Sequence, residues 1–171
     1  MPEIRKGEAT ARCSCGSVEI EATGAPVTCV VCYCKDCQEA GRQIEAMPKA
    51  SAFREADGGT AYVVYRKDRV SVLKGASLLT KHKLDGKSPT NRVVATCCNS
   101  PMLLNFDDGK WWADIYRARH VGNAPSVQMR VCTKSKPENA VILNDVPSYP
   151  AYPFKFIAKL VGARIAMLVG R

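Results

Sequence analysis

The sequence predicts a mainly β domain with cysteine-bearing loops and a helix near its C-terminal end. Short stretches of alternating apolar and polar residues recur along the chain, as they do in half-buried strands. Their length and close spacing favour antiparallel sheets. Nine cysteines, several of them in tight groups, point to loops that bind a metal. The predicted strands are residues 17–21, 60–65, 69–73, 78–84, 92–96, 111–116 and 126–132.

Turn chemistry separates these strands. Gly, Asp and Pro favour turns because they supply left-handed backbone, local side-chain hydrogen bonds and a fixed φ. The turn-forming segments are Asp57-Gly58-Gly59, Lys67-Asp68, Lys74-Gly75, Asp85-Gly86-Lys87-Ser88-Pro89 and Asp107-Asp108-Gly109. Only residues 38–47 and 154–169 have the pattern of helices.

Three cysteines fall within six residues at Cys32, Cys34 and Cys37. Side chains alternate along an extended strand, so Cys32 and Cys34 would point to one face. The chain then turns, and Cys37 adds a third sulfur. Three protein ligands with an open fourth position are typical of a catalytic zinc site. We therefore predict a Zn²⁺ ion here.

A second group joins Cys13 and Cys15 to Cys97 and Cys98. Cys97 and Cys98 are adjacent, so both can reach one metal only if the backbone turns, and the following Asn99-Ser100-Pro101 favours a turn. Cys13, Cys15 and Cys98, with or without Cys97, would then form a closed structural zinc site. The alternative is that Cys97 or Cys98 is a small buried hydrophobic residue.

Two further cysteines are expected outside these sites. Cys29 has C-x-x-C spacing with Cys32 and would close a four-thiolate site, but on a strand it faces away from Cys32. We expect Cys29 to be a core thiol, and Cys132 to be buried rather than a ligand. His82 and His120 have no partner at a metal-binding spacing and are expected to be structural.

Composition restricts the partners and the compartment. At 171 residues and 46% hydrophobic content the chain can build one core, and the formal charge of +9 falls when zinc-bound thiolates are counted. No motif of interleaved aromatic and basic residues accompanies that charge, so nucleic acid is not an expected partner. Residues 1–6 lack an apolar signal core, and grouped thiols suit a reducing compartment, so we expect a cytoplasmic protein.

We divide the chain into a zinc-binding β domain, residues 1–150, and a basic amphipathic helix within residues 151–171. Lys155, Lys159 and Arg164 interrupt the apolar residues of the helix, which is too short and too charged to span a bilayer. We expect it to pack on the β domain or on a partner. That partner would be a second copy of the chain or a membrane surface.

Three blocks of the sequence resemble a known family. They are Cys13-Ser14-Cys15-Gly16, then Cys32-Tyr33-Cys34-Lys35-Asp36-Cys37-Gln38, and then Cys98-Asn99-Ser100-Pro101-Met102. In this order they resemble the glutathione-dependent formaldehyde-activating enzymes, a family that includes centromere protein V. The likeness covers residues 8–105.

The resemblance implies a β-tent fold of antiparallel sheets, a structural zinc on the first and third blocks, and a catalytic-type zinc on the middle block that meets the glutathione thiol. Three positions depart from the family pattern. Tyr33 stands where a histidine is usual, Ala95 occupies the place of a cysteine with Cys97 as its displaced substitute, and Asn99 replaces a glycine. These departures indicate a divergent branch.

The chemistry of a three-thiolate site favours thiol substrates. Three thiolates donate strongly to Zn²⁺, so bound water is a weak nucleophile, whereas a bound substrate thiol loses its proton and can attack a carbonyl carbon. We therefore expect a carbon–sulfur lyase-like enzyme that acts on a small thiol adduct such as S-hydroxymethylglutathione. The alternative is a non-catalytic, zinc-stabilised binding module. Candidate cations for the carboxylates of glutathione are Arg42, Lys81, Lys87 and Arg92.

Overall fold

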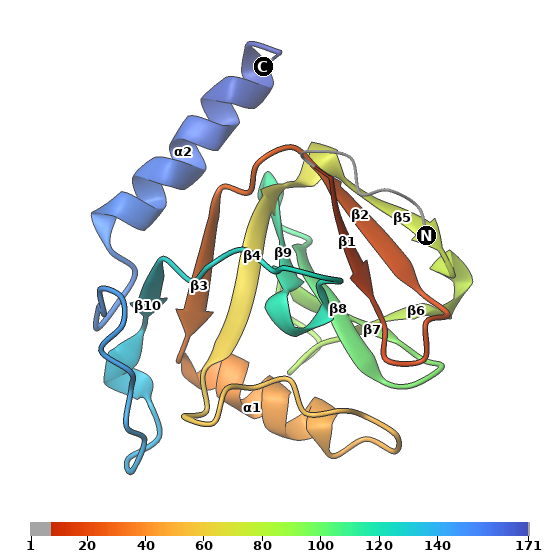
Figure 1. Ribbon diagram of the computed structural model, residues 1–171, viewed down its shortest axis with the longest axis horizontal. Coiled ribbons are helices and arrows are strands. Elements are labelled where there is room, and N and C mark those ends of the chain that lie inside the picture. Colours follow the sequence, from red (N-terminus) through yellow and green to blue (C-terminus); the bar gives the residue numbers. More distant parts are fainter. Residues whose placement is uncertain (1–7, 171) are drawn as a thin grey trace.

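The structure is a computed structural model that describes residues 8–170. Within this range ten strands form two sheets, and two α-helices lie outside them (Figure 1). This arrangement confirms the mainly β class with a C-terminal helix. Residues 1–6, on which the expectation about secretion rests, and Arg171 lie outside the described residues. No helix among residues 8–170 has the length and apolar character needed to cross a membrane.

The elements follow the chain in the order seen in Figure 1. The strands are β1 (Glu8–Arg12), β2 (Glu19–Thr23), β3 (Thr28–Cys32), β4 (Thr60–Arg66), β5 (Val70–Lys74), β6 (Leu79–His82), β7 (Thr90–Ala95), β8 (Ser100–Phe106), β9 (Trp112–Tyr116) and β10 (Met129–Val131). The α-helices are α1 (Lys35–Glu45) and α2 (Phe154–Leu168).

The larger sheet has seven strands in the order β10-β3-β4-β9-β8-β7-β6, and the smaller has three in the order β1-β2-β5. All pairs are antiparallel except β10 with β3, which is parallel. The sequence predicted antiparallel sheets and missed this exception, because the long segment between β3 and β10 hides their pairing. The parallel pair brings the end of β10 beside the end of β3, where Cys32 lies.

The seven-stranded sheet is covered on both faces, so every residue of β4 is buried. Alternate β4 side chains point to opposite sides, as strand geometry requires. Val63 packs with Ile20 of the three-stranded sheet, whereas Tyr62 packs in a second cluster with Ile44 of α1 and Phe156 of α2. The molecule therefore has one core between the sheets and another between the large sheet and the helices.

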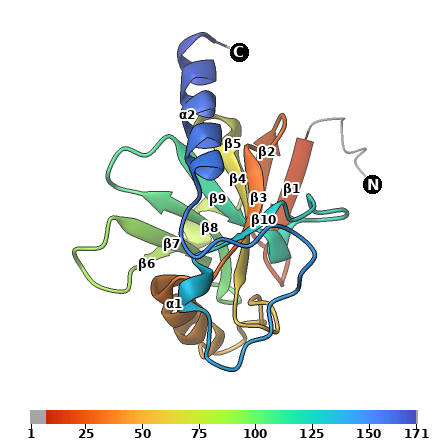
Figure 2. The same cartoon turned by 90° about the vertical axis from the view of Figure 1, so that its left-hand side faces the viewer.

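Helix α2 projects from the body of the molecule, as the two views in Figures 1 and 2 show. Phe156 and Leu160 near its start are buried in the helix-side core. The indole nitrogen of Trp111 donates a hydrogen bond to the carbonyl oxygen of Leu160 at 2.8 Å, and Arg164 lies over the Trp111 ring. The rest of the helix carries large apolar side chains that remain exposed, including Ile165 and Leu168.

The predicted elements differ from the observed ones mainly at their ends. Strand β2 lies two residues later than predicted, and α1 begins at Lys35 rather than at residue 38. The list of predicted strands lacks β1, β3 and β8, although a strand near β3 was assumed in the argument about Cys29, Cys32 and Cys34. Pro101 inside β8 has the local preference of a turn residue. In the structure the chain turns before Ser100, and a register shift near Val94 accommodates the proline.

The half-buried ring of His120 is expected to make stability depend on pH. Burial, with a contribution from Arg117, lowers the pKa of His120 to about 4, and its Nε2 atom has no hydrogen-bond partner within residues 8–170. Between about pH 6.5 and pH 4 the unfolded chain therefore holds more protons than the folded chain, so stability falls as the pH drops through this window. Urea unfolding at pH 7 and pH 5 should show a loss of up to about 2 kcal/mol in the free energy of unfolding, and this loss should be smaller in His120→Gln. An unchanged pH dependence in that variant would contradict this role.

Candidate metal centres and thiol pocket

Four thiols from two distant turns meet between the sheets. Cys13 and Cys15 lie in the turn between β1 and β2, and Cys97 and Cys98 lie in the turn between β7 and β8. All four Sγ atoms lie within 4.8 Å of one another. The Sγ atoms of Cys15 and Cys97 are 3.3 Å apart, and those of Cys13 and Cys97 are 3.8 Å apart. Such a set of four sulfurs can hold a metal ion, and Cys97 is part of it.

Polar groups form hydrogen bonds with the sulfurs of this four-thiol group and with the residues around them. The backbone amide of Val18 donates to Cys13 Sγ at 3.2 Å, and Ser100 Oγ lies 3.1 Å from Cys98 Sγ. The buried Arg119 donates to Ser100 Oγ and to Ser14 Oγ. Its positive charge opposes the negative charge that several thiolates would bring. Burial lowers the pKa of Arg119, and the field of Cys98 and Cys13 partly offsets this effect.

The departures from the family pattern fit the shape of this turn. Ala95 is the last residue of β7 and is fully buried, so a sulfur is supplied two residues later by Cys97. Asn99 has a φ of 50°, in the left-handed region where glycine is favoured and asparagine is tolerated. Its side-chain amide donates to the carbonyl oxygen of Pro48 at 2.9 Å, which holds the turn in place.

The second thiol group lies at the junction of β3 and α1. Strand β3 ends at Cys32, so the prediction that Cys32 and Cys34 share one strand is wrong in detail. Cys34 is instead the N-cap of α1, where its extended backbone keeps the alternation, and the amide of Cys37 donates to Cys34 Sγ at 3.4 Å. The three Sγ atoms lie within 4.8 Å of one another. This group can therefore hold a metal ion with three ligands.

Tyr33 anchors the junction by pointing away from the thiols. Its side chain is fully buried, and its hydroxyl donates to Asp57 Oδ2 at 2.6 Å and accepts from Arg130 Nη1 at 2.7 Å. Gln38 donates to the carbonyl oxygen of Tyr33 at 2.6 Å. The residue that replaces the histidine of the family pattern thus fixes the backbone between two of the sulfurs.

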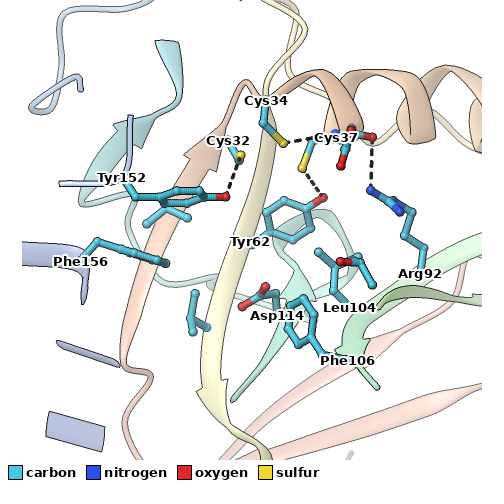
Figure 3. A pocket seen from close by; sticks show the side chains of 14 residues that line it. Cys32, Cys34, Cys37, Tyr62, Arg92, Leu104, Phe106, Asp114, Tyr152 and Phe156 are labelled. Atoms are coloured by element: carbon cyan, nitrogen blue, oxygen red, sulfur yellow. Dashed lines mark hydrogen bonds between the residues drawn. The ribbon is translucent and has the colours of Figure 1, made fainter. Parts of the chain in front are cut away.

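Hydroxyl groups and a fourth thiol surround the three-thiol group. The Tyr62 hydroxyl donates to Cys37 Sγ at 3.5 Å, and the Tyr152 hydroxyl lies 3.7 Å from Cys32 Sγ (Figure 3). Cys132 is buried, as expected, but its thiol also interacts with that of Cys32. Cys132 is not among the three sulfurs that lie within 4.8 Å of one another.

The other sequence-predicted residues lie away from this site. Cys29 packs in the core between the sheets, whereas Cys32 belongs to the helix-side core, as the alternation along β3 predicts. Burial raises the pKa of Cys29 to about 11, which keeps it a neutral thiol. His82 lies beside Gln43, with its Nε2 atom 3.0 Å from the Gln43 side-chain oxygen.

The thiols of the three-thiol group differ in pKa, so negative charge is favoured on one sulfur over the other two. Hydrogen bonds from the Cys32 and Cys37 thiols, together with the Cys37 amide and the field of Arg92, lower the pKa of Cys34 to about 3. The pKa values of Cys32 and Cys37 are raised in turn. The N-terminus of a helix also favours a negative group at its cap. The site is therefore arranged to carry negative charge on sulfur.

A cavity of about 160 Å³ opens beside the three thiols. Its wall opposite the sulfurs is largely apolar and includes Leu104, Phe106 and Phe156. Arg92, which is 2% exposed, also lines it. Arg92 Nη2 donates to the carbonyl oxygen of Asp36 at 3.2 Å, while its Nε and Nη1 atoms have no partner among the described residues. Figure 3 shows the guanidinium near the start of α1.

Only one of the four candidate cations lines this cavity. Arg42 pairs with Glu39 on α1, and Lys81 pairs with Asp107. Lys87 is exposed in the loop between β6 and β7. Arg92 therefore differs from the other three candidates in lining the cavity, a difference that the sequence alone did not indicate.

Comparison with known proteins agrees with this geometry. The family model described as glutathione-dependent formaldehyde-activating enzyme matches residues 8–115. The chain belongs to this family. The match includes both thiol groups and Arg92, whereas residues 116–171, which supply Cys132, Tyr152 and Phe156, lie beyond it.

Searches of the curated proteins and of the solved structures add little to the family assignment. A search of the curated proteins gives no match. Among solved structures, the chain is similar to a crystal structure of a Rhodobacter sphaeroides protein, a structural genomics target, with 18% sequence identity and a TM-score of 0.48. The alignment covers 68% of this chain and 91% of that chain.

Replacement of Cys34 should remove metal from the three-thiol group. A serine hydroxyl is a much poorer ligand for a soft metal than a thiolate, so Cys34→Ser should lose about one metal ion per chain. Elemental analysis of purified protein measures this. Cys29→Ala, a change to a buried thiol outside the group, is the matched control and should retain the full metal content. Equal metal content in both variants would rule out Cys34 as a ligand.

Replacement of Cys15 should reduce stability as well as metal content. A metal that binds only the folded chain adds to its stability, so its loss from the four-thiol group should lower the melting temperature of Cys15→Ala by several degrees. Differential scanning calorimetry with parallel elemental analysis tests this. The prediction fails if Cys15→Ala melts at the wild-type temperature and keeps its metal.

Proposed function

We propose that the protein is a zinc-dependent, carbon–sulfur lyase-like enzyme that acts on a small thiol adduct such as S-hydroxymethylglutathione. The observation that carries this proposal is the open three-thiol group beside a cavity lined by Arg92. Sulfur-only ligand sets favour zinc among the common divalent metals, which supports the choice of ion. The nine free thiols suit a reducing compartment such as the cytoplasm.

The proposed reaction joins or separates a thiol and formaldehyde. The carbon–sulfur bond forms as the sulfur electron pair attacks the carbonyl carbon, and the carbonyl oxygen takes up a proton to become the hydroxyl group. The reverse reaction returns that proton and releases formaldehyde, and neither direction needs an oxidant. When bound, zinc supplies the stabilisation of the substrate sulfur as a thiolate.

The chain supplies the surroundings of that sulfur. The hydroxyl groups of Tyr62 and Tyr152 lie against Cys37 and Cys32 and hold these two sulfurs in position. Arg92 lines the cavity, its Nε and Nη1 atoms have no hydrogen-bond partner among the described residues, and its guanidinium would bind a substrate carboxylate. The apolar walls limit water around the reacting carbon.

Cobalt substitution tests the proposal, because the visible spectrum of Co²⁺ reports its ligands. Addition of glutathione to the cobalt protein should change the spectrum as a fourth sulfur enters the site. Arg92→Gln should bind glutathione about 10-fold or more weakly, since a hydrogen-bonded charged pair contributes about 1.5–3 kcal/mol. Arg42→Gln, on the exposed side of α1, is the matched control and should bind as the wild type does.

A spectrum that already indicates four thiolates and does not respond to any added thiol would exclude the enzymatic proposal. The second candidate function, a zinc-stabilised binding module, would then stand. A specific observation favours it: α2 exposes Phe154, Ile157, Val161 and Ile165 along one side, and no acidic residue occurs in the helix. We propose that this side contacts a membrane surface or a second copy of the chain.

A further inference from the structure

The cavity beside the three-thiol group contains a second charged group that the proposed function does not use. Asp114 of β9 lines the cavity, and its Oδ1 atom is buried with no hydrogen-bond partner among the described residues. Arg92, in the same cavity, keeps two unpartnered N–H groups. No ion pair between these two side chains occurs within residues 8–170.

The sheet register explains why the two charges share a wall but do not meet. Arg92 of β7 pairs with Leu104 of β8, and Leu104 pairs with Asp114 of β9. Paired residues point to the same face, and adjacent strands are about 4.8 Å apart, so the two Cα atoms are separated by roughly 10 Å. Figure 3 shows Asp114 and Arg92 on either side of Leu104. Both side chains therefore line the same cavity from one face of the sheet.

An unpartnered buried charge is costly unless a ligand completes it. Burial raises the pKa of Asp114 to about 7, opposed by the charge of Lys110. A cation placed beside this carboxyl would favour its ionised form, and an anion beside Arg92 would fill the free guanidinium N–H groups. A single ligand group that carries an ammonium and a carboxylate would supply the cation for Asp114 and the anion for Arg92.

We propose that Arg92 and Asp114 form a subsite for the zwitterionic α-amino acid head of the substrate thiol. Arg92 binds the carboxylate and Asp114 binds the ammonium group, while the sulfur lies at the three-thiol group in the same cavity. This inference rests on the proposed function. Two thiols have the required chemistry: cysteine itself, and glutathione through its γ-glutamyl end. The small volume of the cavity, about 160 Å³, favours a compact head group.

The test is a titration of the cobalt-substituted protein with each of four thiols, in which the visible spectrum reports binding. The metal content is measured after each titration. The probes are cysteine, glutathione, cysteamine, which lacks the carboxylate, and 3-mercaptopropionate, which lacks the ammonium. Wild-type protein should bind cysteine or glutathione about 10-fold or more tightly than 3-mercaptopropionate. This comparison needs no variant and does not depend on how well a substituted chain folds.

Variants then assign the two charges. Asp114→Asn should weaken binding of the zwitterionic thiol and of cysteamine about 10-fold or more, and leave 3-mercaptopropionate within about 2-fold. Arg92→Gln should have the opposite pattern and weaken 3-mercaptopropionate but not cysteamine. Glu39→Gln, the same kind of change on exposed α1, should alter none of the four. The folded-state pKa of Asp114 is raised to about 7, so stability falls as the pH rises from about 4 to about 7, and the full cost is present at pH 8. Asp114→Asn should therefore not melt below the wild type at pH 8.

The outcomes separate the inference from the function on which it rests. If the variants weaken the binding of cysteine but not of glutathione, the substrate is cysteine-sized. If they weaken the binding of glutathione but not of cysteine, the subsite binds the γ-glutamyl head. Equal binding of all four thiols, unchanged in Asp114→Asn, would overturn the subsite while the thiol chemistry stands. If no thiol alters the cobalt spectrum, both proposals fall.

Discussion

The site depends on how abruptly a buried strand becomes a helix. Strand β3 ends at Cys32 and α1 begins at Lys35, so only two residues make the change of direction. Tyr33, held by Asp57 and Arg130 on the far side, leaves these residues little conformational freedom. The three sulfurs are therefore brought together before any ion binds, and ligand binding does not have to supply the ordering entropy. The cavity, the tyrosine hydroxyls and Arg92 are all arranged around this fixed point.

Local chemistry explains what could be predicted from the sequence. The alternation of side chains along a strand places Cys29 in one core and Cys32 in the other, and turn residues mark most of the strands. The grouping of cysteines predicts both thiol groups, because ligands to one ion cluster where the chain turns. The position of Cys97 was left open by the sequence, since adjacent residues diverge on a strand, and the turn before Ser100 brings its sulfur to the others.

Long-range pairing explains what could not be predicted. Arg92, Asp114 and Tyr62 come from three strands whose neighbours are known only once the sheet order is known, and Tyr152 arrives from the segment before α2. No spacing rule links such positions. Strand β8 was missed because Pro101 has the local preference of a turn, and tertiary pairing with β7 overrides it. Cys132 reaches Cys32 through the one parallel pair among the described strands.

The four-thiol group joins turns that belong to different sheets, with Cys13 and Cys97 separated by 84 positions in the chain. An ion bound by all four sulfurs would make these turns a single cooperative unit, so that the three-stranded sheet opens only when the larger sheet does. Chelation would separate the two events. Amide protons of β1, β2 and β5 would then exchange with solvent before those of β4, and the boundary between fast and slow exchange would follow the interface between the sheets.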